Sequence, residues 1–306
     1  MHPLAEQRLL SYKKSMMILR MMALVLLFSA LPFQQAHAEQ YLPEIFSPEH
    51  TIVWNTVEQG LDVATLSSPV KRGGSFSHHI EIRVLRFHTE HFEFRLFSSR
   101  WEGISPPTMH EWAEKKSLVS AINAGMYMKD GLSTGYMRSG TQTNNGRIVS
   151  RYGSFFVSSP DDDSLPRSAV LDRSFDDWQS MLPHYHTVVQ NFRLMGPAGQ
   201  QLWPEKGPEH AIAAIAEDLN GRILFLHCST PVSVYSFVEI LKEHTDLNIH
   251  SAMYMEGGSE ASLMARLSGT VQVWNGMTPA SYMLSSRGGD IPLPNILGVI
   301  RRSPPH

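Results

Sequence analysis

Residues 211–226 of the chain read AIAAIAEDLNGRILFL, and this stretch is the most informative one about the fold. Two apolar runs, at 211–216 and 223–226, flank the dipeptide Asn220-Gly221. Such a dipeptide tolerates the positive φ angles of a tight turn between antiparallel strands. The stretch therefore predicts a β-hairpin, the clearest one in the sequence.

The chain after this hairpin predicts a helix, a strand and a second helix. Residues 234–241 carry apolar side chains at i, i+3, i+4 and i+7, which predicts an amphipathic helix packed on the hairpin. Residues 252–255 predict a short buried strand that runs straight into Gly257-Gly258-Ser259. Residues 261–267 then resume a helical pattern, so the sequence predicts a strand, a glycine turn and a helix in that order.

The chain before the hairpin alternates apolar and charged residues at 80–84 and 92–96, which predicts two strands joined as a hairpin. Thr108, followed three residues later by a glutamate, has the signature of a capping box. It predicts a helix that runs through 112–116, and the apolar residues 118–122 predict a strand after it.

Hairpins mixed with helices favour an α+β fold, because a doubly wound parallel sheet would alternate strand and helix more regularly. No linker of low complexity and no repeat of fixed period divides the chain after residue 38. We therefore expect a single domain built on a mixed, largely antiparallel sheet with flanking helices.

The first 38 residues have the three parts of a cleaved secretory signal. Four basic residues precede an apolar run at 21–33, and the small residues of Ala36-His37-Ala38 suit a signal peptidase. The apolar run is shorter than the ~20 residues that a membrane-spanning helix needs. The sequence thus predicts a signal peptide at 1–38, a periplasmic or secreted location, and no stable membrane span after cleavage. Residues 39–74 form a segment of uncertain structure.

Charge and cysteine content exclude two further classes. Without residues 1–38 the formal charge moves from -3 to -6, and a mildly acidic protein is a poor binder of nucleic acid. Cys228 is the only cysteine, so a disulfide framework is excluded. Its place in an apolar run predicts a buried, structural thiol.

Several polar residues lie where predicted strands end and could face a cleft. Glu256 follows a buried strand and precedes Gly257, Gly258 and Ser259, whose free backbone N–H groups favour an anion. Glu256 and Ser259 could instead simply cap a helix. His210 begins the strand of the central hairpin and could present an imidazole to the same cleft.

A second group of candidates comes from the first half of the chain. Asn123 and Gly125 follow the strand predicted at 118–122, and Arg138 lies in a glycine-spaced stretch that could approach a phosphate or sugar closely. The alternative for that stretch is a glycine-rich surface loop. Gln190 opens a further polar segment.

Known catalytic motifs are missing from the chain. His78-His79 and His184-Tyr185-His186 are the densest histidine pairs, but neither has the helical spacing of a zinc hydrolase. We expect no bound cofactor and no metal site, although a divalent cation in an anion-binding pocket stays open. A metal-dependent hydrolase using these histidines is the weakest of the alternatives.

In order, these segments resemble the phosphodiester glycosidase domain over residues 75–301. That family includes the lysosomal uncovering enzyme, N-acetylglucosamine-1-phosphodiester α-N-acetylglucosaminidase, and many bacterial envelope proteins. Residues 122–127, INAGMY, resemble the family's Ile-Asn-Gly-Gly-Phe-Phe. Residues 255–261, MEGGSEA, resemble its Leu-Asp-Gly-Gly-Gly-Ser-Ser. Segments 190–197, 210–214 and 294–299 are similar to its Gln-x-Gly-Pro, Arg-Thr-Ala-Ile-Gly and Pro-Asn regions.

The resemblance implies a bacterial, exported glycosidase that hydrolyses a sugar-1-phosphodiester in an envelope or extracellular glycan. It implies Glu256 as nucleophile or general base. The sugar would be oriented by Asn123 and Gln190, and the phosphate would be held by Arg138, His210 and the amides of Gly257 and Gly258; Gly125 and Ser259 complete the expected substrate site. Two residues depart from the family pattern: His210 replaces an arginine and Glu256 replaces an aspartate. The alternative is a non-catalytic periplasmic protein that binds a glycan or assists polymer assembly.

Overall fold

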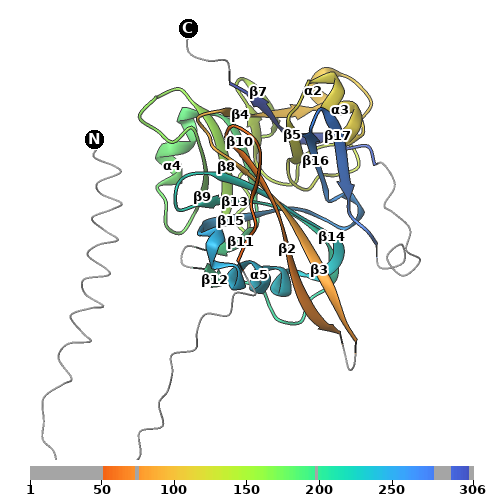
Figure 1. The fold of residues 1–306 in the computed structure, drawn as a ribbon. Coiled ribbons are helices and arrows are strands. Elements are labelled where there is room, and N and C mark those ends of the chain that lie inside the picture. Colours follow the sequence, from red (N-terminus) through yellow and green to blue (C-terminus); the bar gives the residue numbers. More distant parts are fainter. Residues whose placement is uncertain (1–50, 73–75, 197–198, 279–290, 303–306) are drawn as a thin grey trace, which may run out of the picture. The chain divides into compact units, whose positions relative to one another are not determined.

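A computed structural model of the chain describes residues 51–72, 76–196, 199–278 and 291–302, which belong to one compact unit. The signal peptide predicted at 1–38 lies outside the described residues. Strands dominate this unit and helices are few (Figure 1). Every strand pairing among the described residues is antiparallel. The predicted largely antiparallel sheet is therefore confirmed, but the fold is richer in strands than a balanced α+β protein.

The strands form three sheets. In spatial order, the largest contains β1 (Asn55–Glu58), β2 (Leu61–Arg72), β3 (Phe76–Phe87), β14 (Ile223–Ser233), β13 (Glu209–Asp218), β15 (Ile249–Gly257), β11 (Arg193–Gly196) and β12 (Gln200–Gln201). The second contains β7 (Gln142–Asn145), β6 (Met137–Ser139), β10 (Tyr185–Asn191), β8 (Ser154–Pro160) and β9 (Ser168–Asp172). The third contains β17 (Thr270–Asn275), β16 (Ser262–Leu267), β5 (Ser120–Asn123), β18 (Asn295–Arg301) and β4 (Phe92–Ser98).

The helices are short. They are α2 (Ser99–Glu102), α3 (Met109–Lys115), α4 (Trp178–Met181) and α5 (Val234–Glu243), with 3₁₀ turns η2 (Leu182–His184), η4 (Thr245–Leu247) and η5 (Gly258–Glu260). The capping box before α3 is confirmed, because the side chains of Thr108 and Glu111 each accept a hydrogen bond from the other's backbone N–H. The predicted helix on the hairpin is also confirmed as α5, which Ser233 caps.

The hairpin predicted at 211–226 is confirmed as β13 and β14, at the middle of the largest sheet. Gly221 has a φ of +74°, and its N–H donates to the carbonyl of Asp218 at 2.9 Å. The Asp218 carboxylate accepts from the backbone N–H groups of Asn220 and Arg222, both at 2.9 Å. The turn is thus built by a left-handed glycine and an aspartate that satisfies the loop's own donors.

The main core lies where the three sheets meet, and aromatic rings fill its centre. Phe94 from β4 makes edge contacts with Phe87, Phe156 and Phe225, at centroid distances of 5.6–5.8 Å. These four rings come from all three sheets, so burial of one cluster holds the sheets together. A separate apolar cluster covers the other face of the largest sheet, where α5 packs.

The hairpin predicted from 80–84 and 92–96 is wrong, although both strands exist. β3 pairs with β2 and β14, whereas β4 pairs with β18 in another sheet. The short connection at His88–His91 turns a corner between two sheets instead of folding one strand back on the other. Phe87 and Phe92, on either side of the corner, enter the same core. Sequence alternation gives the strands but not the partners.

The helix predicted at 261–267 is also wrong, because residues 262–267 form β16 between β17 and β5. Both faces of β16 are buried: Leu263 and Ala265 face the main core, and Met264 faces the cluster under α3. A strand buried on both faces loses the alternation that would distinguish it from a buried helix. Only η5, a single turn, precedes it.

The compact unit begins before residue 75, the predicted start of the family domain. β2 lies within the segment 39–74 and pairs with β3 along its whole length, from Leu61 opposite Phe87 to Arg72 opposite Phe76. Leu61 and Leu66 are fully buried. Part of this segment is therefore a constituent of the largest sheet.

Replacing Phe94 by alanine tests the aromatic centre. The ring is fully buried and contacts three others, so we expect the free energy of unfolding to fall by about 3–5 kcal/mol. Urea unfolding measures it. The matched control is Phe175→Ala, since that ring is 63% exposed and its loss should change stability by less than ~0.5 kcal/mol. Equal effects in the two variants would contradict the assignment.

Candidate active site at the end of β15

The glycine turn, residues 256–261, connects β15 in the largest sheet to β16 in the third sheet. Glu256 opens it and is still paired with Ala213 of β13. The N–H of Gly257 donates to Glu256 Oε1 at 3.0 Å. Gly258 has a φ of +74°, a left-handed conformation that favours glycine. The turn thus leaves a half-buried carboxyl group at the exact point where the chain changes sheets.

Asn123, at the end of β5, fixes this turn from the side. Its Nδ2 donates to the Glu260 carbonyl at 2.8 Å, and its Oδ1 accepts from the Ser262 N–H at 2.7 Å. The Ser262 hydroxyl donates to the same Glu260 carbonyl at 3.1 Å. Asn123 is almost fully buried, so its amide holds the glycine turn in place instead of presenting a free group to a ligand.

The environment of Glu256 favours its protonated form. The pKa of the Glu256 carboxyl is raised to about 8, mainly by burial and to a smaller extent by the nearby Glu260 carboxylate, while the hydrogen bond from the Gly257 N–H opposes the shift. A carboxyl group with such a pKa holds a proton at neutral pH. Shifts of this kind are typical of functional sites. Glu256 is therefore equipped to donate a proton rather than to act as an ionised base.

A histidine–tyrosine pair forms one wall of the turn. His210 Nε2 lies 3.0 Å from the Tyr254 hydroxyl, and burial lowers the pKa of His210. Burial and the charge of Glu256 together raise the pKa of Tyr254. Both groups are thus neutral at pH 7. A Cβ at Gly257 would overlap the Tyr254 hydroxyl and lie 2.5 Å from His210 Cδ2, so only glycine fits here.

Tyr127 is a further neighbour of the turn. Burial raises the pKa of its phenol to about 12, with further contributions from Glu256 and Glu260. Because both carboxylates act on this ring, Tyr127 lies beside the glycine turn. It lies two residues after Gly125, which has a φ of +100° and where an added Cβ would lie 3.5 Å from Asn191 Nδ2, so the chain runs close to β10 here. Asn191 in turn donates to the Met255 carbonyl at 2.9 Å.

His227 lies beneath the turn and is fully buried. Its Nε2 is 3.1 Å from the Ala261 carbonyl, which requires that nitrogen to carry the hydrogen. Burial lowers the pKa of His227 to about 4, so the ring stays neutral over the physiological range. Cys228, the next residue, is buried too, and burial raises the pKa of its thiol to about 12. The predicted burial of this thiol is confirmed.

Two predicted ligand-binding residues have other partners. Arg138 donates through Nη2 to the carbonyls of Leu182 and Tyr185, at 3.0 and 2.6 Å. It pairs with Val188, whose side chain belongs to the apolar cluster on the outer side of the second sheet. Arg138 therefore faces away from the main core and is not part of the group around Glu256.

Gln190 is buried and uses its whole amide on backbone groups. Its Oε1 accepts from the N–H groups of Tyr136 and Val149, and its Nε2 donates to the carbonyls of Val149 and Tyr152. This side chain ties the segment after β7 to the second sheet. It stabilises the scaffold and has no hydrogen-bonding capacity left for a sugar.

Of the predicted residues, the structure therefore brings together those of the glycine turn and its walls: Glu256, Gly257, Gly258, Ser259, His210, Asn123 and Gly125. Sequence reasoning assigned no role to Tyr127, Tyr254 or Glu260. The available signals were the four-residue spacing of Glu256 and Glu260 and the tyrosine two residues before Glu256. Neither signal tells which side chains share a wall, because that depends on strand register.

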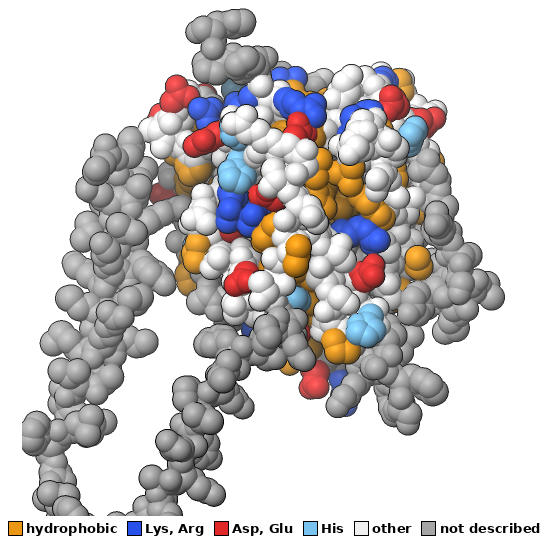
Figure 2. Space-filling view, in the orientation of Figure 1, with side chains coloured by type: hydrophobic (Ala, Val, Ile, Leu, Met, Phe, Trp, Pro, Cys, Tyr) orange, Lys and Arg blue, Asp and Glu red, His pale blue; other side chains and the backbone are white. Residues whose placement is uncertain are grey.

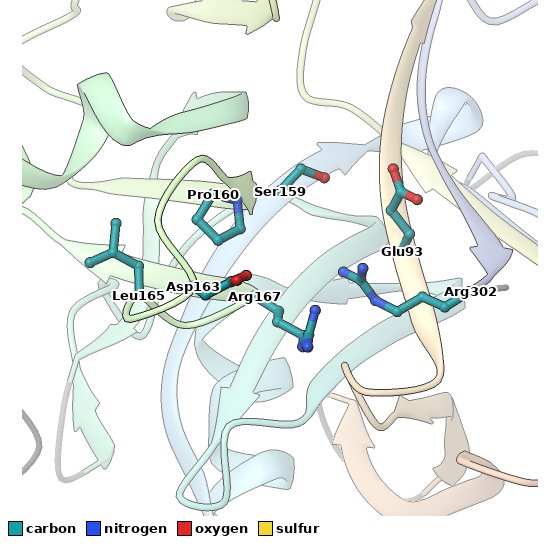
Figure 3. Close-up of a pocket in the computed structure, with 7 residues that line it drawn as sticks. All are labelled: Glu93, Ser159, Pro160, Asp163, Leu165, Arg167 and Arg302. Carbon is teal, nitrogen blue, oxygen red and sulfur yellow. The ribbon is translucent and has the colours of Figure 1, made fainter. Parts of the chain in front are cut away.

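Two cavities among the described residues bear on the site. One, of 290 Å³, is lined in part by Tyr127 and so adjoins the candidate site. The other, of 220 Å³, is lined by Glu93, Ser159, Pro160, Asp163, Leu165, Arg167 and Arg302 (Figure 3). Arg302 follows β18 and Asn295 begins it, so that cavity lies about one strand length, roughly 20 Å, from the glycine turn. It is not part of the candidate active site.

The charged side chains outside the glycine turn form no metal-binding site among the described residues. Acidic and basic side chains are interspersed on the face drawn in Figure 2, without one extended basic patch. Across the described ranges, no three His, Cys, Asp or Glu side chains gather as metal ligands would. In the same ranges, no helix has the length and apolar character to cross a bilayer. His184 contacts Asp161 at 3.2 Å.

Comparison with known protein families gives the class of protein. The family model described as phosphodiester glycosidase matches residues 116–300, more than half of the chain. The chain therefore belongs to the phosphodiester glycosidase family, which confirms the resemblance found in its sequence. No curated protein matches the chain.

Two solved structures share the fold. One is the catalytic domain of zebrafish N-acetylglucosamine-1-phosphodiester α-N-acetylglucosaminidase, described as auto-inhibited by its pro-peptide. It has a TM-score of 0.56 and 13% identity, with 89% of this chain and 97% of that chain covered. The other is a hypothetical protein from Synechocystis, with a TM-score of 0.52 and 12% identity, covering 82% of this chain and 64% of that one. At these identities, the likeness concerns the fold.

The buried acid predicts a pH-dependent stability difference. Because the pKa of Glu256 is raised on folding, its contribution to the free energy of unfolding is fully present below about pH 4.5. This contribution is lost progressively as the pH rises toward 8. Glu256→Gln should therefore raise the free energy of unfolding at pH 8.5 by roughly 1–4 kcal/mol and change it little at pH 4.5. Chemical denaturation at the two pH values measures this. Glu90→Gln, at an exposed position, is the control, and a Glu256→Gln gain independent of pH would contradict the assignment.

Proposed function

We propose that this protein is an exported glycosidase that hydrolyses the bond between a sugar's anomeric carbon and a phosphodiester oxygen, in an envelope or extracellular glycan. The observation that carries the proposal is the position of the Glu256 carboxyl group, which the Gly257 N–H orients at the glycine turn, and its raised pKa supports the proposal. A positioned acid of this pKa can protonate a leaving oxygen in the transition state at neutral pH. Membership of the family supports the glycosidase class.

The raised pKa of Glu256 favours a role as general acid. The sequence instead suggested a nucleophile or a general base. Those two roles need an ionised carboxylate, whereas burial and Glu260 favour the neutral form. A phosphate is already a good leaving group, so the acid's contribution is to neutralise charge that develops on the departing oxygen. Gly257 N–H keeps Oε1 oriented.

Glu260 supplies the second carboxyl group that glycoside hydrolysis normally requires. Its charge acts on both Glu256 and Tyr127, and Ser259 Oγ donates to its Oε2 at 2.9 Å. The backbone of Glu260 is fixed by Asn123. In the proposed step the C1–O bond breaks, a proton passes from Glu256 to the phosphate oxygen, and water adds to C1. Glu260 accepts the proton that this water releases.

The neutral walls fit a sugar better than an anion. The His210–Tyr254 pair and the Tyr127 phenol offer hydroxyl and imidazole groups without permanent charge. Such groups can donate to and accept from sugar hydroxyls. The arginine that the family carries at position 210 would instead offer a fixed cation.

That same substitution favours the second candidate function. A protein that kept the fold and the sugar-facing walls, but lost its phosphate-binding arginine, would bind a glycan without cleaving it. We therefore retain a non-catalytic role in glycan binding or polymer assembly as the alternative. The predicted signal peptide supports a periplasmic or secreted location for either function.

Turnover by the mature chain, starting at Glu39, tests the proposal. A panel of hexose and N-acetylhexosamine 1-phosphodiesters of glycerol should release reducing sugar from at least one member. Glu256→Gln should lower kcat by about 10²–10⁴-fold, while Glu90→Gln should retain wild-type activity. Saturable binding of a panel member without release of sugar would refute the enzyme and establish the alternative.

The pH profile separates the roles of the two carboxyl groups. Activity should fall as the pH rises through about 8, because Glu256 must be protonated. Removing the negative charge in Glu260→Gln lowers the pKa of Glu256, so the alkaline limb of any residual activity should move to lower pH. Initial rates between pH 5 and 10 measure both effects. An alkaline limb that stays in place would show that Glu260 does not act on Glu256.

A further inference from the structure

The chain from Tyr127 to Ser133 is a tight hairpin that extends from the candidate site. Tyr127 and Ser133 form an antiparallel bridge. The N–H of Met128 donates to the Leu132 carbonyl, and the N–H of Gly131 donates to the Met128 carbonyl, both at 2.8 Å. Lys129 and Asp130 therefore lie at the tip, two and three residues from a ring that borders Glu256.

Two asparagines hold this tip rigidly against the core. The Gly131 carbonyl accepts from Asn295 Nδ2 at 2.9 Å and from Asn144 Nδ2 at 3.4 Å. Gly131 has a φ of +77°, and a Cβ there would lie 3.0 Å from Pro294. The hairpin is thus fixed by buried amides, and Lys129 is presented from a defined position.

The 290 Å³ cavity lies between this hairpin, the start of α2 and the segment before β18. Its lining comprises Ser99, Arg100, Ile104, Pro106, Tyr127, Lys129, Asp130, Gly131, Pro292 and Pro294. One wall is polar and cationic, and the other is formed by prolines and an isoleucine. Such a mixture suits a ligand that has a charged group and a short carbon skeleton.

Only one of the cavity's charges is free in the described part of the chain. Arg100 Nη1 donates to the Asp130 carbonyl and Oδ2, at 2.8 and 3.1 Å. The other oxygen of Asp130 accepts from the Leu132 N–H at 3.1 Å. Among the described residues, the Lys129 ammonium has neither a hydrogen bond nor an ion pair. The carboxylate that could neutralise it is already occupied.

We propose that this cavity is the subsite for the phosphate and the aglycone, with Lys129 as the phosphate-binding cation. The inference rests on the proposed function, because it assumes that the sugar lies at Glu256. Tyr127 borders both the cavity and Glu256, so a sugar whose anomeric oxygen contacts the acid extends its 1-phosphate past the edge of that ring into the cavity. An ammonium is a compact point charge that suits a phosphodiester's non-bridging oxygens.

The subsite also restricts the substrate class. A volume of 290 Å³ is just below the ~300–1,000 Å³ range of ligand pockets. A cavity of this size suits a phosphate esterified to a small alcohol such as glycerol, and it is too small for a phosphate esterified to a nucleoside. Lys129 also replaces Arg138, the cation expected from the sequence, which faces the outer side of the second sheet.

Kinetics on paired substrates test the subsite. Lys129→Gln should raise KM about tenfold for a sugar-1-phosphoglycerol, because a charged contact is lost. KM for a neutral aryl glycoside of the same sugar should stay unchanged, and Lys129→Arg should restore most of the loss. Lys206→Gln, an exposed lysine outside the cavity, is the matched control and should behave as wild type.

Binding of glycerol 1-phosphate keeps the subsite testable if no substrate turns over. Calorimetry on wild type and Lys129→Gln should show about tenfold weaker binding in the variant, whether or not the protein is an enzyme. Equal affinity for glycerol 1-phosphate, or an equal rise in KM for the phosphodiester and the neutral glycoside, would overturn the subsite. Absence of turnover with intact, Lys129-dependent binding would refute only the proposed glycosidase activity.

Discussion

The glycine turn and the candidate site depend on one buried amide at a sheet boundary. Asn123 ends β5 in the third sheet and bonds to both sides of the turn through which the chain leaves the largest sheet. Without it, the Glu260 carbonyl and the Ser262 N–H would be buried with fewer partners, at a cost of about 1–3 kcal/mol each. The same two bonds fix where Glu256 and Glu260 lie relative to β5, and hence relative to Tyr127 four residues further on. Asn123 therefore both stabilises the turn and positions the two carboxyl groups. A polar residue at the end of a strand can in this way affect function without contacting a ligand.

Around this amide, the protein combines a low dielectric with uncharged polar walls. Glu256 keeps its proton because it is buried and because a second carboxylate is near. His210 and Tyr254 stay neutral for the same reason of burial. The charged groups of the two proposals lie outside these walls: the Glu260 carboxylate acts on Glu256 and Tyr127, and Lys129 lines the adjoining cavity. In the proposed function, Glu256 would therefore hold the proton and Lys129 would attract the phosphate.

The sequence predicted much of this and failed for identifiable reasons. Asn220-Gly221, the capping box at Thr108 and the periodicity of 234–241 are local signals, and each gave the right element. Strand partners are not local: residues 80–84 and 92–96 alternate correctly but enter different sheets. Residues 262–267 are buried on both faces, so their pattern carries no strand period. Arg138 is a similar case, because one residue of register decides which face of β6 a side chain occupies. Glu256 was found because its motif is contiguous, whereas Lys129 and Tyr127 are joined to it only in space.

On unfolding, buried His227 and Glu256 exchange protons with the solvent in opposite directions. Below pH 6.5, His227 takes up a proton when the protein unfolds, because its pKa in the folded protein is lowered to about 4. Above pH 4.5, unfolding releases the proton that folded Glu256 retains up to about 8. Between these limits the uptake and the release cancel, so these two groups together make no net proton exchange on unfolding. His227 and Glu256 together therefore leave the free energy of unfolding level across this mildly acidic range, while the folded protein keeps an uncharged acid at the glycine turn.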